Sequence, residues 1–305
     1  MQRYILILLL IVSVSCNKQN KDKATVDFAE TIDSDQNLNA NESKAVYIAI
    51  ASMTSPKETY TYYSELIEYI SKKVGYPIYI KQKKTYEEVN LLLENSEVDF
   101  AFICSGAFVD EYKNNKIKLL VAPEIKQKLS YNAYIITQKE SGIEKIADFK
   151  GKSFAFTDPL SNTGRLYPLK EIAEQDQNES DFFRKVIYTY GHDISIQMVN
   201  QGIMDGASVH SLIYDYIALH NPEKVENIKI IQKSEEYGIP PIVTPVSLDQ
   251  KSFNTYQKIF LEIHNDSLGK IILDKLLIDK FRLVNDSIYK SVFQLKEYID
   301  HEDAK

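Results

Sequence analysis

The sequence predicts an α/β protein of two lobes joined by a two-strand hinge, and two observations lead to this fold class. Short apolar runs typical of strands alternate with longer segments of helical apolar spacing, an order that favours parallel strands with helices on both faces. The strand-like run 130–137 leaves the first group of elements, and segment 234–245, with Gly238 and three prolines, returns to it. Two such crossings indicate lobes that close by hinge bending.

The N-terminal segment is predicted to be a lipoprotein signal peptide, residues 1–16. Its apolar run from Ile5 to Val14 is too short for a membrane span and is followed by Cys16. We expect Cys16 to be lipidated and to anchor the protein to a membrane of the cell envelope, facing the periplasm or the exterior. Ser13 stands where a lipobox usually has Leu, so a cleaved signal peptide with an unrelated cysteine is the alternative. The polar residues 17–44 predict a disordered tether.

The first lobe begins at Ala45 and is predicted to comprise residues 45–133 and, after the chain returns, residues 236–305. Thr85 is expected to cap a helix, Gly75 to end one, and Cys104 to be buried and unpaired. The predicted strands are 46–51, 77–81, 99–103 and 117–122, and the predicted helices are 62–74, 85–95, one after Cys104, and those within 249–300.

The second lobe is predicted to comprise residues 134–235 and to contain two consecutive strand–turn–helix units. In the first, Phe154 and Phe156 belong to a strand, and Asp158-Pro159 turns the chain. A polar trio, defined here as Ser161, Asn162 and Thr163, then precedes Gly164 and a helical run through Ile172. In the second unit, the strand 186–189 leads through Gly191 to a helix opened by His192-Asp193. Further strands are expected to end at Ser208 and to cover 228–232, with His210 opening a helix.

These helix starts indicate a site for an oxyanion. Helix N-termini carry unpaired N–H groups and a partial positive charge, and Gly164 allows close backbone approach. Neighbouring units of one parallel sheet bring both helix starts to the same edge. The alternative is that the polar residues before each helix only cap it.

Four separated segments occur in the order typical of one family. They are 148–164 (DFKGKSFAFTDPLSNTG), 191–193 (GHD), 202–207 (GIMDGA) and 239–243 (IPPIV). With them, residues 45 to 280 resemble the PhnD-like substrate-binding proteins of phosphate, phosphite and phosphonate ABC transporters. The resemblance implies a type II periplasmic-binding-protein fold, an ABC permease and ATPase as partners, and a monomer without a cofactor.

The resemblance also implies which residues bind the ligand. Ser161, Asn162 and Thr163 match the family's anion-binding trio, usually Ser-Thr-Ser, so Asn162 is a departure. His192 is expected to donate a hydrogen bond to phosphoryl oxygens. The remaining expected cleft residues are Tyr86, Tyr131 and Ser105; Ser52, Ser55 and His210 are weaker candidates, and Arg165 is expected at the surface.

A second departure concerns the carboxylates with which relatives that bind 2-aminoethylphosphonate hold the ammonium group. Here the corresponding segments are 209–214 (VHSLIY) and 239–243 (IPPIV), and neither contains an acid. Because an ammonium buried without a counter-charge is costly, we expect phosphate, phosphite or a small alkylphosphonate as the ligand.

Other classes of function are less well supported by the residues. The net charge of −7 disfavours a nucleic-acid partner, which needs a basic surface. No nucleophile–base pair, metal-spaced His/Cys cluster or Walker-type loop is visible, so we predict neither an enzyme nor a metal site. A ligand-sensing or surface-interaction lipoprotein on the same fold, or a binder of another small anion such as a sulfonate, remains the alternative.

Overall fold

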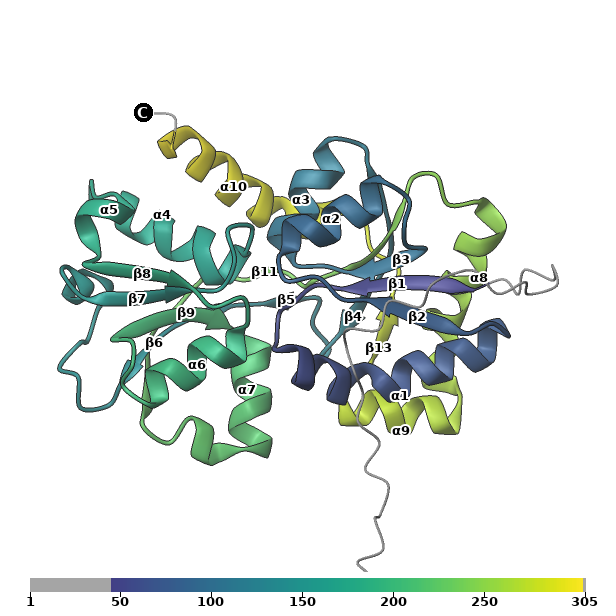
Figure 1. The fold of residues 1–305 in the computed structure, drawn as a ribbon, viewed down its shortest axis with the longest axis horizontal. Helices are drawn as coiled ribbons and strands as arrows, with labels where there is room; N and C mark the ends of the chain where they lie inside the picture. Colours follow the sequence, from purple (N-terminus) through teal and green to yellow (C-terminus); the bar gives the residue numbers. More distant parts are fainter. Residues whose placement is uncertain (1–44, 304–305) are drawn as a thin grey trace, which may run out of the picture. The chain divides into compact units, whose positions relative to one another are not determined.

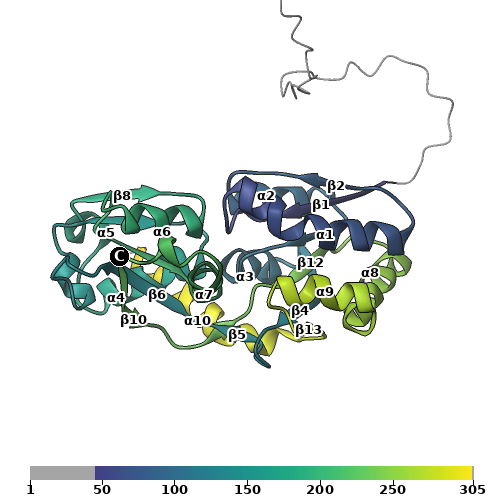
Figure 2. The same ribbon diagram turned by 90° about the horizontal axis from the view of Figure 1, so that it is seen from below.

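A computed structural model describes residues 45–303, which form two α/β lobes (Figure 1). The predictions for the signal peptide, Cys16 and the tether lie outside the described residues. Figure 2 shows the lobes from a second side, with strand β5 (Ser130–Tyr131) crossing between them. Among the helices of residues 45–303, none combines the length and hydropathy that a membrane span requires.

The sheet of the first lobe has the strand order β13-β4-β12-β3-β1-β2. Its strands are β1 (Val46–Ile50), β2 (Ile78–Lys81), β3 (Phe100–Phe102), β4 (Ile117–Glu124), β12 (Ile242–Pro245) and β13 (Lys280–Arg282). Strand β1 pairs in parallel with β2 and β3, as predicted. Beyond β3 the sheet is mixed, because β12 lies antiparallel between β3 and β4. This strand belongs to the returning segment, so it enters the sheet from the side of the other lobe.

The helices of this lobe mostly follow the predicted boundaries. They are α1 (Pro56–Val74), α2 (Tyr86–Glu94), α3 (Ser105–Lys113), α8 (Gln250–Glu262), α9 (Ser267–Lys275) and α10 (Lys290–Asp303), with short 3₁₀ turns at Ile263–Asn265 and Asp286–Tyr289. Thr85 caps α2 through a capping box with Glu88, and the left-handed Gly75 (φ 80°) ends α1. Helix α1 begins earlier than predicted because Pro56, whose φ suits a first helical turn, initiates it.

The sheet of the second lobe has the order β10-β6-β9-β7-β8. Its strands are β6 (Ala133–Gln138), β7 (Ser153–Phe156), β8 (Lys185–Tyr188), β9 (Gly206–His210) and β10 (Ile228–Lys233). Its helices are α4 (Tyr167–Ala173), α5 (Glu179–Phe182), α6 (His192–Asn200) and α7 (Ser211–His220), with a π-helical turn at Asn162–Leu166 and 3₁₀ turns at Ile146–Phe149 and Pro222–Lys224. Strand β7 pairs in parallel with both β8 and β9. The segments that follow these three strands therefore begin at one edge of the sheet, as predicted for the first two.

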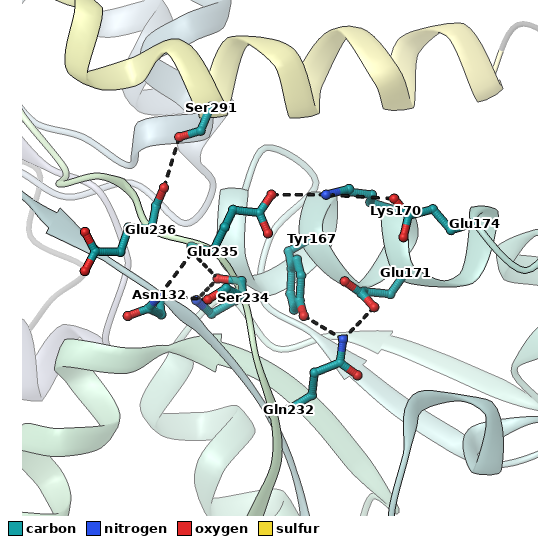
Figure 3. Close-up of polar contacts among 11 residues, drawn as sticks. Asn132, Tyr167, Lys170, Glu171, Glu174, Gln232, Ser234, Glu235, Glu236 and Ser291 are labelled. Atoms are coloured by element: carbon teal, nitrogen blue, oxygen red, sulfur yellow. Dashed lines mark hydrogen bonds and ion pairs between the residues drawn. The ribbon is translucent and has the colours of Figure 1, made fainter.

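Two crossing strands connect the lobes. Strand β5 pairs antiparallel with β11 (Tyr237–Gly238), and the predicted strand 130–137 is split at Asn132 into β5 and β6. The Asn132 side-chain amide donates to the carbonyl oxygens of Ser234 (2.8 Å) and Glu235 (3.1 Å), so it ties one crossing to the other (Figure 3). Glu235 in turn pairs with Lys170 of α4 at 3.1 Å (Figure 3). The two crossing segments are thus hydrogen-bonded to each other, and the returning segment is also paired with the second lobe.

Helix α10 contacts both lobes. Lys296 pairs with Asp110 of α3 at 3.3 Å, and α10 also packs against α4 of the second lobe (Figure 1). Ser291 at its start donates to the Glu236 carbonyl oxygen at 3.2 Å (Figure 3). One hydrophobic cluster accordingly contains Val292 and Leu295 of α10 together with residues of both sheets.

Replacing Asn132 with Ala should lower the free energy of unfolding by about 1–3 kcal/mol, because it removes two hydrogen bonds that join the crossing segments, each contributing about 0.5–1.5 kcal/mol. Urea unfolding followed by circular dichroism measures this difference. The matched control is Asn254→Ala on the exposed face of α8, expected to change stability by less than about 0.5 kcal/mol. Equal stabilities of the two variants would contradict the role given to Asn132.

Candidate functional site

The polar trio follows strand β7 and is fully buried. The Asp158 carboxylate accepts the Leu160 N–H (2.8 Å), and Ser161 Oγ accepts the Gly164 N–H (3.0 Å). Ser161 is therefore an N-cap, as the alternative interpretation proposed, yet its hydroxyl hydrogen can still donate. A Cβ at Gly164 would lie 2.4 Å from Thr157 Oγ1, so only glycine allows this approach. The Asn162 side-chain amide donates to the Tyr131 hydroxyl at 3.2 Å.

His192 opens α6, as predicted, and is fully buried. Its Nδ1 accepts the backbone N–H of His210 (3.2 Å) and lies 3.0 Å from Thr157 Oγ1. A backbone N–H can only donate, so Nδ1 carries no hydrogen and Nε2 does. Burial lowers the pKa of His192 to about 3, which keeps the ring neutral. Nε2 has no hydrogen-bond partner and is a free donor.

The first lobe and the crossing contribute Tyr86, Ser105 and Tyr131, all of them buried. Burial raises the pKa of the Tyr86 and Tyr131 hydroxyls, so both remain protonated. Beside the Tyr131 hydroxyl lie the polar side chains of Ser105, Asn162 and Thr163, which lower its pKa slightly. Ser105 itself donates to the Gly238 carbonyl oxygen at 2.6 Å, so only its lone pairs are left for a ligand.

The lobes touch at this place. The Tyr86 N–H donates across to the Asp158 carboxylate (3.1 Å), and the His192 N–H donates to the Met53 carbonyl oxygen (2.9 Å). The Asp193 carboxylate accepts the Ser55 N–H at 2.8 Å, a third contact between the lobes. The described conformation is therefore closed over the trio and His192.

Four buried polar atoms of this cluster lack a hydrogen-bond partner: the Tyr86 hydroxyl, Asn162 Oδ1, Thr163 Oγ1 and His192 Nε2. Polar atoms that are buried without a partner are costly and rare, so the grouping of four of them here marks a candidate ligand site. Three of the four can donate a hydrogen, which suits an oxygen-rich anion. Arg165 does not take part, because its guanidinium donates to the Tyr188 hydroxyl at 2.9 Å. In residues 45–303 no group of acidic, His or Cys side chains has the arrangement of a metal site.

The sequence patterns did not predict the roles of two residues in this cluster, Thr157 and His210. Thr157 orients His192, and nothing in its local pattern indicates that role, since its partner is far along the chain. His210 was predicted only as a weaker cleft candidate; its ring is buried and stacks on Tyr131 with centroids 4.1 Å apart. The weaker candidate Ser52 instead donates to the Lys83 carbonyl oxygen at an exposed position.

The family pattern described as "ABC transporter, phosphonate, periplasmic substrate-binding protein" matches residues 48–289. The chain belongs to this family. The family is one of transport proteins rather than enzymes, and its substrate-binding members act outside the cytoplasm.

Individual members of the family are identical to this chain at about a quarter of the aligned positions. The "phosphonates-binding periplasmic protein" of Escherichia coli is 23% identical over 272 residues, which are 87% of this chain and 79% of that protein. The "phosphate-import protein PhnD" of Mycolicibacterium smegmatis is 26% identical over 225 residues, covering 70% of this chain and 64% of that protein.

Solved structures of the family share the fold. A binding protein component of a phosphonate ABC transporter from Pseudomonas aeruginosa superimposes with a TM-score of 0.80 at 20% identity, covering 86% of this chain and 88% of its own. PhnD1 from Prochlorococcus marinus in complex with methylphosphonate gives a TM-score of 0.76 at 14% identity. The superposition covers 84% of this chain and 98% of the PhnD1 chain. The predicted type II periplasmic-binding-protein fold is thereby confirmed.

The buried, neutral His192 predicts a loss of stability in acid. An unfolded chain protonates this histidine near pH 6.5, whereas the folded protein does so only near pH 3. Between these values the unfolded state binds more protons, so the free energy of unfolding falls as the pH decreases. Lowering the pH from about 7 to about 5 should therefore reduce the thermal midpoint less in His192→Gln than in the unaltered protein. His301→Gln, whose side chain is 71% exposed, is the control. Identical pH profiles for all three proteins would show that His192 is not held neutral by the fold.

Proposed function

We propose that this protein binds a small phosphorus oxyanion between its lobes and delivers it to an ABC importer. The observation that carries the proposal is the group of buried donors without partners: Tyr86, Thr163 and His192. Related proteins are named for phosphonate, phosphate and phosphite, which share a tetrahedral, oxygen-rich phosphorus centre. In this proposal residues 45–133 and 236–305 form one lobe, and residues 134–235 form the lobe that carries the trio.

The proposed binding sequence starts on the second lobe. Ser161, Thr163 and His192 lie at the starts of two neighbouring helical segments and receive the anion first. Tyr86 and Tyr131 then approach as the lobes close, and the closed form docks on the permease. Hydrogen bonds to an ionised group contribute about 1.5–3 kcal/mol each. Several of them together support micromolar binding, which requires about −8 kcal/mol.

The charge of the site favours anions without an amine. The residues from His210 to Tyr214 and from Ile239 to Val243 include no acid, and the nearby Asp215 pairs with Lys126 at 3.8 Å. The carboxylates of Asp158 and Asp193, which lie beside the donors, already accept backbone N–H groups. An ammonium group would thus compete with these bonds for a counter-charge, whereas phosphate, phosphite or a small alkylphosphonate needs none.

The proposal includes a lipid anchor on Cys16, outside the described residues. The apolar run before Cys16 and the polar residues after it are typical of a lipoprotein with a tether. Such an anchor would keep the binding protein near its permease, at the outer face of a membrane.

Replacing Ser161 or His192 with Ala should weaken binding by at least about tenfold, since each removes one donor to a charged group. Titration calorimetry with phosphate, phosphite and methylphosphonate measures the affinity, and circular dichroism verifies folding. Ser180→Ala, at an exposed position of α5, is the control. Unchanged affinity in both site variants would show that these residues do not form the binding site.

Sulfate and a small sulfonate are titrated in the same way to test the class of anion. If either binds more tightly than the phosphorus compounds, the protein is a binder of sulfur oxyanions instead.

The anchor is tested with the full-length chain in a bacterial host that processes lipoproteins. We expect the protein to incorporate labelled palmitate and to fractionate with membranes, and Cys16→Ser to abolish both. Cys104→Ser, which alters a buried thiol of the folded domain, should leave labelling unchanged. Labelling that persists in Cys16→Ser would contradict the anchor.

A further inference from the structure

A cavity of about 140 Å³ lies between the lobes next to the buried donors. The end of β1, the start of α1, the start of α7 and the returning segment at Ile239 all contribute to it. Its lining includes Ala51, Met53, Thr54, Thr59, His210 and Leu212.

The cavity and the donor cluster share part of their walls. His210 lines the cavity, while its ring stacks on Tyr131 and lies 5.8 Å from the His192 ring. Met53 also lines the cavity, and its carbonyl oxygen accepts the His192 N–H. Ala51 belongs to the wall and packs in one cluster with Tyr86. The cavity therefore adjoins the donor cluster across these shared residues.

The chemistry of the lining is apolar and uncharged. No Asp, Glu, Lys or Arg contributes to it, and most of its members are aliphatic, proline or phenylalanine residues. The two threonines satisfy each other, because Thr54 and Thr59 hydroxyls lie 2.9 Å apart and Thr59 also donates to the Thr54 carbonyl oxygen. An apolar group is thus favoured over most of this lining, whereas a buried ammonium or carboxylate would find no opposite charge among the lining residues.

We infer that the ligand is a phosphonate with an uncharged, apolar substituent larger than methyl, and that this cavity holds the substituent. The inference rests on the proposed function and narrows its substrate class. The size agrees, since an apolar cavity of about 150 Å³ holds a benzene ring. Three carbons of a propyl group or one phenyl ring are therefore of suitable size, while inorganic phosphate or phosphite would leave the cavity empty.

The test compares ligands that differ only in the substituent, by titration calorimetry on the unaltered protein. Each buried methylene should improve affinity about fourfold, so propylphosphonate should bind about 15-fold more tightly than methylphosphonate. Phenylphosphonate should also bind more tightly than methylphosphonate. 2-Aminoethylphosphonate has nearly the same size as propylphosphonate but carries an ammonium, and it should bind at least about 100-fold more weakly than propylphosphonate.

A charge placed in the wall provides the second measurement. Leu212→Glu adds a carboxylate to the lining at the start of α7, and it should reduce the preference for propyl over aminoethyl by at least about tenfold. The matched control is Leu219→Glu on the same helix, whose side chain is 63% exposed, and it should leave the preference unchanged. Circular dichroism establishes that both variants are folded.

The outcomes separate this inference from the proposed function. Binding of phosphate and methylphosphonate with no gain for propyl or phenyl overturns the apolar subsite but leaves the phosphorus oxyanion site intact. Absence of binding for every phosphorus compound in the unaltered protein overturns the proposed function itself. If Leu212→Glu does not fold, the ligand series on the unaltered protein still decides between these outcomes.

Discussion

The hydrogen bond from the His210 backbone to the His192 ring determines what the site can do. Because that N–H can only donate, it fixes the hydrogen of the neutral imidazole on Nε2. Burial then keeps the ring uncharged, so the site offers a donor rather than a full positive charge. The Tyr86 and Thr163 hydroxyls, also buried without partners, complete a set of neutral donors. Such a set favours an anion whose charge is spread over several oxygens.

The helix starts are used differently from the way the sequence suggested. The N-terminal N–H groups of His192 and Tyr86 do not point at a ligand; each donates across to the opposite lobe, to the Met53 carbonyl and the Asp158 carboxylate. The backbone N–H groups of these two residues thus join the lobes, while their side-chain donors remain available for a ligand. In the proposed function, the residues whose backbone groups join the lobes are thus also residues whose side chains would bind the anion, so closure and binding would be coupled.

Local patterns were sufficient to predict much of the fold. The Thr85 cap, the Gly75 stop, the turn at Asp158 and the helix start at His192 all depend on residues within one turn of each other. Features that depend on distant residues could not be predicted in this way. They include the insertion of β12 between β3 and β4, the short strand β13, and the support of His192 by Thr157. The apolar cavity was also invisible, since its lining comes from segments that are far apart in sequence.

The contact of Gly106 with the second lobe has a consequence for how closely the lobes approach. A Cβ at Gly106 would lie 2.2 Å from the Leu160 carbonyl oxygen and 2.9 Å from the Asn162 nitrogen, so main chain meets main chain there. Peptide groups cannot change rotamer as side chains do, and their positions are set by the helix and turn that contain them. A larger residue at position 106 would therefore hold the two lobes apart, because neither main-chain segment has a side chain that could move away.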